Sequence, residues 1–282
     1  MREFSLDIPA VAIRGLRGGR PGGPRVLALH GWLDNAASFL PLAPYLGEVD
    51  LVAPDLPGHG HSGHLPPGVE YTFAGAVHDV LDIADALGWE RFGLLGHSMG
   101  AGIACLVAAG CPQRVERLVV IEALGALPED PARTAERLRE AVAARRALRG
   151  KRLRVFADAE PAVRARMQAN GLSAASARLL VERGLAEVEG GAAWSSDPRL
   201  TVPTMTRMTD AQVDDLVAGI GCPTRVIYAD PPQPYLPEPE RSRRAGLLPR
   251  GELAVLPGGH HLHMEDPAAV AAAIGDFFLR DA

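Results

Sequence analysis

Short apolar runs alternate with helical patterns along most of this chain, and this alternation constrains its fold more than any other feature. The runs are bounded by turn residues and cover positions 26–29, 49–53, 92–95, 118–121, 225–228 and 253–256. Helical patterns follow at about 36–46, 72–87, 99–110, 238–248 and 267–278. Strands that are apolar on both faces belong to sheets covered by helices on both sides, and such sheets are largely parallel. The pattern therefore predicts an α/β protein.

The alternation stops between about residues 127 and 216. This stretch is rich in Ala, Arg and Glu, shows the periodicity of several amphipathic helices and contains no convincing strand. The simplest interpretation is a helical insertion into a sheet domain. We therefore expect a core domain built from residues 1–126 and 217–282, with residues 127–216 forming a helical cap.

The composition is that of a globular protein with a sizeable core, since 47% of the 282 residues are hydrophobic and 22% are charged. The formal net charge of −5 is spread along the chain, which disfavours binding to nucleic acid or to a membrane surface. Three cysteines without zinc-type spacing, and a start without the pattern of a signal peptide, favour a cytoplasmic location. The sequence does not indicate an oligomeric state.

A Gly-x-Ser-x-Gly motif at residues 96–100 lies between an apolar run and a helix rich in small residues. In this context the motif predicts a tight turn from strand to helix that holds Ser98, strained and exposed, above the carboxyl edge of the sheet. The flanking glycines give the backbone room for that turn. Ser98 is thus the candidate nucleophile, and the Met99 amide at the helix N-terminus is a candidate donor to an oxyanion.

A second candidate oxyanion donor lies in the sequence His-Gly-Trp at residues 30–32, directly after an apolar run. A turn at this position would present the Trp32 amide at the same sheet edge as Ser98. An ordinary turn that contains a glycine could have the same three residues. The assignment of the Trp32 amide as an oxyanion donor therefore depends on the motif around Ser98.

The candidate general base lies in the sequence Gly-Gly-His-His-Leu-His at residues 258–263, which follows the last apolar run. A serine hydroxyl needs a neighbouring imidazole to accept its proton. His260 is favoured because the two glycines before it free the backbone to bring the ring over the sheet edge. We interpret His261 and His263 as surface or packing residues.

The segment 55–63 contains two patterns that suggest other chemistry. Its glycines match Gly-x-Gly-x-x-Gly, but prolines at 66 and 67 prevent a helix from starting there, so a dinucleotide site is disfavoured. Histidines at 59, 61 and 64 have the spacing of a metallo-hydrolase motif, but Gly63 stands where that motif usually places Asp. We therefore expect neither an organic cofactor nor a metal.

Two carboxylates compete for the role of orienting the imidazole. Glu122 ends the run at 118–121, where an unpaired buried carboxylate would be costly and an imidazole at the same edge is the obvious partner. Asp230 follows the run at 225–228 and is the rival. Both choices keep the chain order serine, acid, histidine.

With these residues assembled, the sequence resembles the α/β-hydrolase superfamily and, within it, the serine hydrolase-like group. The resemblance covers nearly the whole chain, from the His-Gly turn at 30–31 to the segment 259–267. It implies an eight-stranded, mostly parallel sheet with a helical cap inserted after the sixth strand. It also implies Ser98 as nucleophile, His260 as base and the Trp32 and Met99 amides as the oxyanion hole.

The sequence departs from most of these relatives at the acid, which they carry as an Asp a few residues after the seventh strand. The stretch 230–235 has prolines and Gln233 where that acid normally falls. A minority, typified by some haloalkane dehalogenases, carry the acid after the sixth strand, and the position of Glu122 matches theirs. The resemblance therefore favours Glu122 over Asp230. Those dehalogenases and the related epoxide hydrolases use Asp as nucleophile, so Ser98 disfavours both activities.

We therefore expect a hydrolase that cleaves small-molecule carboxylic esters of small to medium, mainly apolar acyl groups. Apolar side chains that could line an acyl pocket, or could be plain core, are those of Trp32, Met99, Leu124, Trp194 and Met205. One alternative is the hydrolysis of a lactone, a thioester or a carbon–carbon bond by the same residues. Another is a ligand-binding protein of this fold with little or no turnover.

Overall fold

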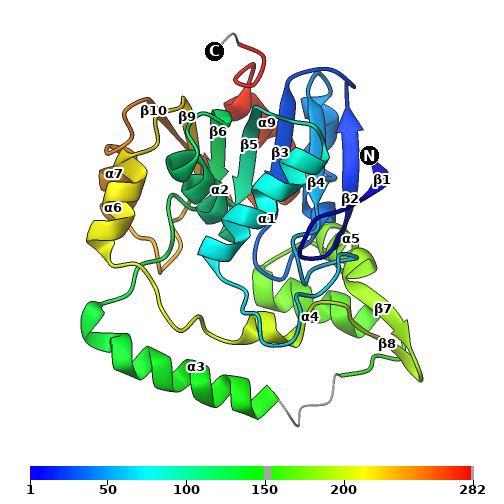
Figure 1. Cartoon of the computed structure of the whole chain (residues 1–282). Coiled ribbons are helices and arrows are strands. Elements are labelled where there is room, and N and C mark those ends of the chain that lie inside the picture. Colours follow the sequence, from blue (N-terminus) through cyan, green and yellow to red (C-terminus); the bar gives the residue numbers. More distant parts are fainter. Residues whose placement is uncertain (149–153, 281–282) are drawn as a thin grey trace.

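An eight-stranded sheet forms the centre of the protein, which is described here by a computed structural model of residues 1–148 and 154–280 (Figure 1). The strand order is β1-β2-β4-β3-β5-β6-β9-β10. The pairs β1–β2 and β2–β4 are antiparallel and the other pairs are parallel, so the predicted sheet type is confirmed. The strands are β1 (Arg2–Asp7), β2 (Ala12–Gly19), β3 (Arg25–Leu29), β4 (Asp50–Pro54), β5 (Phe92–His97), β6 (Val115–Ile121), β9 (Thr224–Asp230) and β10 (Gly251–Pro257).

The first two strands have no counterpart among the apolar runs of the sequence. β1 lies at the edge of the sheet, and its residues alternate between exposed and half-buried positions at its carboxyl end. An antiparallel edge strand keeps one face in water, so it lacks the continuous apolar character of a strand buried on both faces. The sequence pattern therefore identified the six strands of the parallel part of the sheet and missed the two antiparallel strands at one edge.

Helices cover both faces of the sheet, as expected. On one face α1 (Phe73–Ala86) and α2 (Met99–Gly110) share an apolar cluster with side chains of α6 (Asp210–Ala218) and α7 (Glu240–Ala245). On the other face lie η1 (Ala36–Phe39), η2 (Ala43–Leu46), α8 (Leu262–Glu265) and α9 (Pro267–Ile274). The helix expected at 36–46 is thus two short 3₁₀ turns, because prolines at 41 and 44 lack the amide that a continuous helix needs.

Most of the described segment between β6 and β9 lies at one end of the sheet, below it in Figure 1, whereas its last helix, α6, lies beside the sheet next to α7. It comprises η3 (Pro131–Arg133), α3 (Thr134–Leu148), α4 (Glu160–Asn170), α5 (Ala174–Gly184), β7 (Leu185–Val188), β8 (Gly191–Trp194), η4 (Pro198–Thr201) and α6 (Asp210–Ala218). The expectation that it contains no strand was wrong, because β7 and β8 form an antiparallel hairpin. Each has four residues, too few for a clear periodic signal.

The expected cap boundary at residue 216 falls inside α6. Val213 and Val217 of this helix are fully buried in the same apolar cluster as α1 and α2, so α6 packs with the sheet domain. Residues 149–153 of the expected cap lie outside the described residues. Below, "the cap" denotes the elements from η3 to η4.

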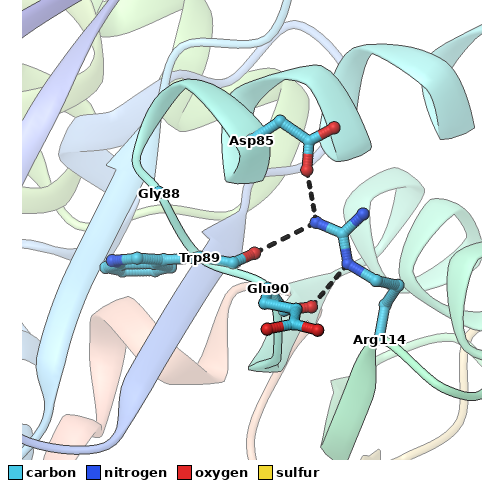
Figure 2. Close-up of a pocket in the computed structure, with 5 residues that line it drawn as sticks. All are labelled: Asp85, Gly88, Trp89, Glu90 and Arg114. Atoms are coloured by element: carbon cyan, nitrogen blue, oxygen red, sulfur yellow. Dashed lines mark hydrogen bonds and ion pairs between the residues drawn. The ribbon is translucent and has the colours of Figure 1, made fainter.

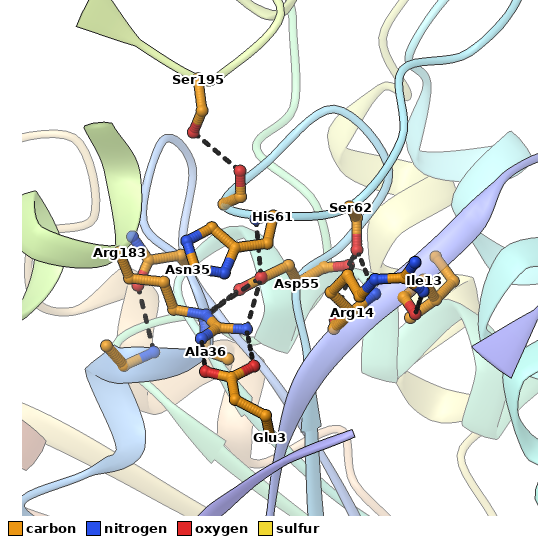
Figure 3. A network of polar contacts seen from close by, with 12 residues as sticks. Glu3, Ile13, Arg14, Asn35, Ala36, Asp55, His61, Ser62, Arg183 and Ser195 are labelled. Atoms are coloured by element: carbon orange, nitrogen blue, oxygen red, sulfur yellow. Dashed lines mark hydrogen bonds and ion pairs between the residues drawn. The ribbon is translucent and has the colours of Figure 1, made fainter. Parts of the chain in front are cut away.

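A buried ion pair attaches the cap to the core (Figure 3). Arg183 at the end of α5 donates from Nε to the carboxylate of Asp55 at 2.9 Å and from Nη1 to Glu3 at 2.6 Å. The same Asp55 carboxylate accepts hydrogen bonds from the amides of Ala36 and His61. The glycine- and histidine-rich segment 55–63 is therefore a support for the cap.

Candidate active site

Ser98 lies at the predicted turn between β5 and α2. Its backbone has φ 51° and ψ −115°, a region that residues other than glycine rarely adopt. A side chain at either flanking glycine would collide with the backbone, since a Cβ at Gly96 would lie 2.5 Å from the Ala101 Cα and one at Gly100 would lie 2.0 Å from the Leu29 carbonyl oxygen. The two glycines therefore allow the close packing that holds Ser98 in this conformation.

The structure brings Ser98, His260 and Glu122 together. The Oγ atom of Ser98 lies 2.9 Å from Nε2 of His260, and Nδ1 of the same ring lies 3.2 Å from Oε2 of Glu122. A ring in this arrangement carries its proton on Nδ1 and offers the Nε2 lone pair to the serine hydroxyl. The arrangement can remove a proton from Ser98 and stabilise the imidazolium that results.

Backbone contacts hold the Glu122 carboxylate in place. Glu122 follows β6, is 3% exposed and has φ 60°. Its Oε1 accepts a hydrogen bond of 2.6 Å from the Ala229 amide in β9, and its own amide donates to the Ile227 carbonyl. The rival carboxylate, Asp230, is exposed at the end of β9 and is not among the groups in contact with the His260 ring. The structure thus places Glu122 beside the imidazole.

Tyr235 is a residue of this site that sequence reasoning missed. Its hydroxyl lies 3.1 Å from Nδ1 of His260, next to the Glu122 carboxylate. Burial, together with the nearby charge of Glu122, raises the pKa of Tyr235 to about 12, so the hydroxyl keeps its proton at neutral pH. The signal lay in the stretch 230–235, where a tyrosine follows the prolines that displace the usual acid.

The two candidate oxyanion donors lie in segments that follow neighbouring strands of the sheet, β3 and β5. Met99 is the first residue of α2, and Trp32 follows β3. Neither backbone amide donates to a protein acceptor within the described part of the chain, so both are free to bind a ligand oxygen. The indole of Trp32 is 53% exposed, and its Nε1 donates to the Leu200 carbonyl in the cap.

The apolar residues considered for an acyl pocket do not all lie where a pocket would need them. Leu124 is 1% exposed and belongs to the main core cluster, so it is core. Trp194 packs edge-on against Phe156 inside the cap, with ring centroids 6.1 Å apart. Met99 directly follows the nucleophile in the chain, and Trp32 follows β3, the strand next to β5.

A surface pocket lies at the opposite edge of the sheet (Figure 2). It is lined by Asp85, Gly88, Trp89, Glu90 and Arg114, and the Arg114 guanidinium bonds the Asp85 carboxylate and the Trp89 carbonyl. These residues adjoin the amino end of β5, whereas Ser98 follows its carboxyl end. The pocket is therefore not part of the candidate active site.

Two other histidines anchor the loops beside the site. His30 donates from Nδ1 to the Gly31 carbonyl and accepts the Leu56 amide at Nε2. Burial lowers the pKa of His30 to about 4 and that of His59 to about 3, so both rings are neutral at neutral pH. The histidines at 59, 61 and 64 do not form a group of metal-ligating side chains in the part of the chain that the structure describes.

His261 and His263 are packing residues, and both are buried. His261 approaches Asp34, with 3.2 Å between Nε2 and Oδ2, and His97 approaches the same oxygen at 3.6 Å from Nδ1. Asp34, His97 and His261 are the side chains among the described residues whose spacing could hold a metal ion. The sequence did not single out Asp34 or His97.

Comparison with known proteins agrees with this fold. Residues 24–175 match the family model described as the alpha/beta hydrolase fold. The chain is 30% identical over 288 residues to a serine hydrolase-like protein of Danio rerio, covering 98% of this chain and 87% of that protein. It is 42% identical to a hypothetical protein of Pseudomonas aeruginosa PAO1 with a solved structure, at a TM-score of 0.93 over 99% and 100% of the two chains.

A thioesterase domain from the curacin biosynthetic pathway is also similar in structure, with a TM-score of 0.84 and 26% identity over 99% of both chains. No helix among the described residues has the length and apolar character needed to span a bilayer. The fold, the strained serine at the strand-to-helix turn and these relatives together identify the chain as a member of the α/β-hydrolase superfamily and of its serine hydrolase-like group.

Proposed function

We propose that this hydrolase cleaves carboxylic esters through an acyl-enzyme on Ser98, with His260 as general base and Glu122 as the acid that orients it. The observation that carries the proposal is the 2.9 Å approach of Ser98 Oγ to His260 Nε2, on a ring whose other nitrogen faces a buried carboxylate. This geometry is what an activated serine nucleophile requires.

The acylation step follows from these contacts. Ser98 Oγ attacks the ester carbonyl carbon while its proton passes to His260 Nε2, and the negative charge that forms on the carbonyl oxygen is bound by the Trp32 and Met99 amides. The tetrahedral intermediate then expels the alcohol, which takes the proton from Nε2, and leaves the acyl group on Ser98. Glu122 stabilises the imidazolium that exists between the two proton transfers.

Deacylation repeats the same proton transfers with water as the nucleophile. His260 accepts a proton from water, the hydroxyl attacks the acyl carbonyl, and the proton then returns to Ser98 Oγ as the acid is released. The exposed Trp32, which follows the strand next to β5, and the half-buried Met99, which follows Ser98 in the chain, are the apolar side chains that we assign to the acyl group. Apart from the substrate and water, these steps use only groups of the chain itself.

Two measurements test the proposal. The purified protein is expected to hydrolyse p-nitrophenyl esters and to be labelled at Ser98 by a fluorophosphonate, and the Ser98→Ala variant is expected to do neither. Absence of both signals in the wild-type protein would refute the hydrolytic role and leave a ligand-binding protein of the same fold.

Thioester hydrolysis is a second candidate, favoured by the similarity to the curacin thioesterase domain. The same serine, base and oxyanion donors can attack either carbonyl. An oxygen ester and a thioester with the same acyl chain separate the two activities. A kcat/KM at least tenfold higher for the thioester, after allowance for their uncatalysed hydrolysis rates, would favour the second.

A further inference from the structure

The Asp34 carboxylate lies in the turn that carries the Trp32 amide, and it is buried. Its Oδ2 lies 3.2 Å from His261 Nε2, and its Oδ1 accepts a hydrogen bond from the Arg166 guanidinium of cap helix α4. Gly31 makes room for the group, since a Cβ there would lie 2.8 Å from Asp34 Oδ2 and 2.9 Å from His97 Nδ1. Asp34 therefore joins the cap to the segment that contains His260.

A second contact holds the backbone of His260 itself. His97 Nε2 lies 2.8 Å from the His260 carbonyl oxygen, which can only accept, so His97 carries its proton on Nε2. Burial lowers the pKa of His97 to about 4, which keeps this ring neutral at neutral pH. The main chain of His260 is thus supported by His97 on one side and, one residue later, by the bond from His261 to Asp34.

The cap meets this same turn at three points. Besides the Arg166 contact, Trp32 Nε1 donates to the Leu200 carbonyl at 2.9 Å and Asn35 Nδ2 donates to the Leu180 carbonyl at 2.8 Å. Met264, four residues after His260, packs in the apolar cluster of the cap. The cap, the turn at residues 31–35 and the segment that contains His260 therefore meet at one junction around Asp34.

A bridging metal is the alternative occupant of this junction, because Asp34, His97 and His261 have suitable ligand atoms. A cation there would have to share the Asp34 carboxylate with the Arg166 guanidinium, whose side chain is 12% exposed. Two cations on one carboxylate in a site with little water repel each other strongly. The charges therefore favour the ion pair alone.

We propose that Asp34 is a positioning residue that couples the docking of cap helix α4, through Arg166, to the placement of the His260 ring. A buried carboxylate that loses its cation moves towards water or loses its charge, and either change disturbs the bond to His261. A displacement of about 1 Å in the reacting groups can cost about 100-fold in rate. The inference rests on the proposed hydrolytic function, but the coupling itself can be measured without turnover.

The experiment compares Arg166→Gln with the matched control Arg178→Gln. Arg178 lies on the neighbouring cap helix α5, and its ion pair with Glu160 is exposed. In Arg166→Gln, whose substitution lies in α4, we expect faster amide hydrogen exchange in the distant segment 259–266. We expect unchanged exchange in β6. We also expect the rate of fluorophosphonate labelling and kcat to fall about 10- to 100-fold with KM changed less than threefold. Arg178→Gln should match the wild type.

The conservative variants Arg166→Lys and Asp34→Asn complete the test. Arg166→Lys keeps the charge and should retain most of the protection from amide exchange in the segment 259–266. Asp34→Asn should show the same faster exchange there as Arg166→Gln. Unchanged exchange at 259–266 in Arg166→Gln would overturn the coupling, as would a uniform increase that includes β6. A stoichiometric metal in the wild type that Asp34→Asn loses would overturn it as well. If the wild type lacks turnover and labelling, the hydrolytic function fails while the exchange data still decide the coupling.

Discussion

One carboxylate oxygen of Glu122 lies 3.2 Å from Nδ1 of His260, although 138 residues separate the two in the sequence. Both follow the carboxyl ends of strands, Glu122 after β6 and His260 after β10, and only β9 lies between these strands in the sheet. The Ala229 amide of β9 binds the other oxygen of Glu122. The intervening strand thus fixes the carboxylate that faces the imidazole.

Replacing Glu122 by Gln should lower kcat by up to about 10⁴-fold, because an amide cannot stabilise the imidazolium and can hold the ring in the wrong tautomer. Steady-state hydrolysis of a p-nitrophenyl ester measures the effect. Asp230→Asn is the matched control and should retain activity within about twofold, since this carboxylate is exposed to solvent. Loss of turnover in the Asp230 variant alone would show that the acid has been misassigned.

The hydroxyl of Tyr235 should contribute much less than Glu122. It lies 3.1 Å from the same Nδ1 and stays protonated, because the pKa of Tyr235 is raised to about 12. A single neutral hydrogen bond contributes about 0.5–1.5 kcal/mol, so Tyr235→Phe should lower kcat/KM by about 2- to 10-fold. A loss comparable to that of Glu122→Gln would mean that the tyrosine, and not the carboxylate, orients the ring.

Gly100 should not tolerate a side chain. A Cβ at this position would lie 2.0 Å from the Leu29 carbonyl oxygen, so Gly100→Ala must shift β3 or α2 and should lower the free energy of unfolding by about 1–3 kcal/mol or more. A Cβ at Gly110, at the other end of α2, would meet no atom of the described chain within 4 Å, so Gly110→Ala should be neutral or stabilising by up to about 1 kcal/mol. Urea unfolding of both variants gives the comparison, and equal stabilities would contradict the packing argument.

Stability should decrease as the pH falls below about 6.5. Burial lowers the pKa of folded His30 to about 4 and of folded His59 to about 3, whereas an unfolded histidine titrates near 6.5. Between these values the unfolded chain binds protons that the folded chain excludes, so each histidine removes about 1.4 kcal/mol per pH unit as the pH drops. Above about pH 6.5 their contribution is complete.

Urea unfolding between pH 7 and pH 5 measures this slope. His59→Asn should reduce this slope of unfolding free energy against pH by about the contribution of one histidine, if the variant folds. His78→Gln should leave the slope unchanged because His78 is exposed on α1. A wild-type slope near zero in this range would show that the buried histidines take up protons in the folded state.

The local pattern of the sequence was sufficient for the sheet class, for the turn at Ser98 and for the start of α9, where Asp266 accepts a hydrogen bond from the Ala269 amide as N-cap and Pro267 follows at the first helical position. These features depend on residues a few positions apart, and propensity and periodicity act over that range. The resemblance to relatives that carry the acid after the sixth strand favoured Glu122, and the residues alone left Asp230 open.

Only the tertiary structure decided which side chains meet. The tertiary structure places the Glu122 carboxylate beside His260, although Asp230 ends the strand next to β10, and it brings Tyr235 to the same nitrogen. It also gathers Asp34, His97 and Arg166 from three distant parts of the chain. Pairings across more than a hundred residues depend on sheet order, on loop paths and on where the cap docks, and no local preference of the backbone or its side chains encodes these.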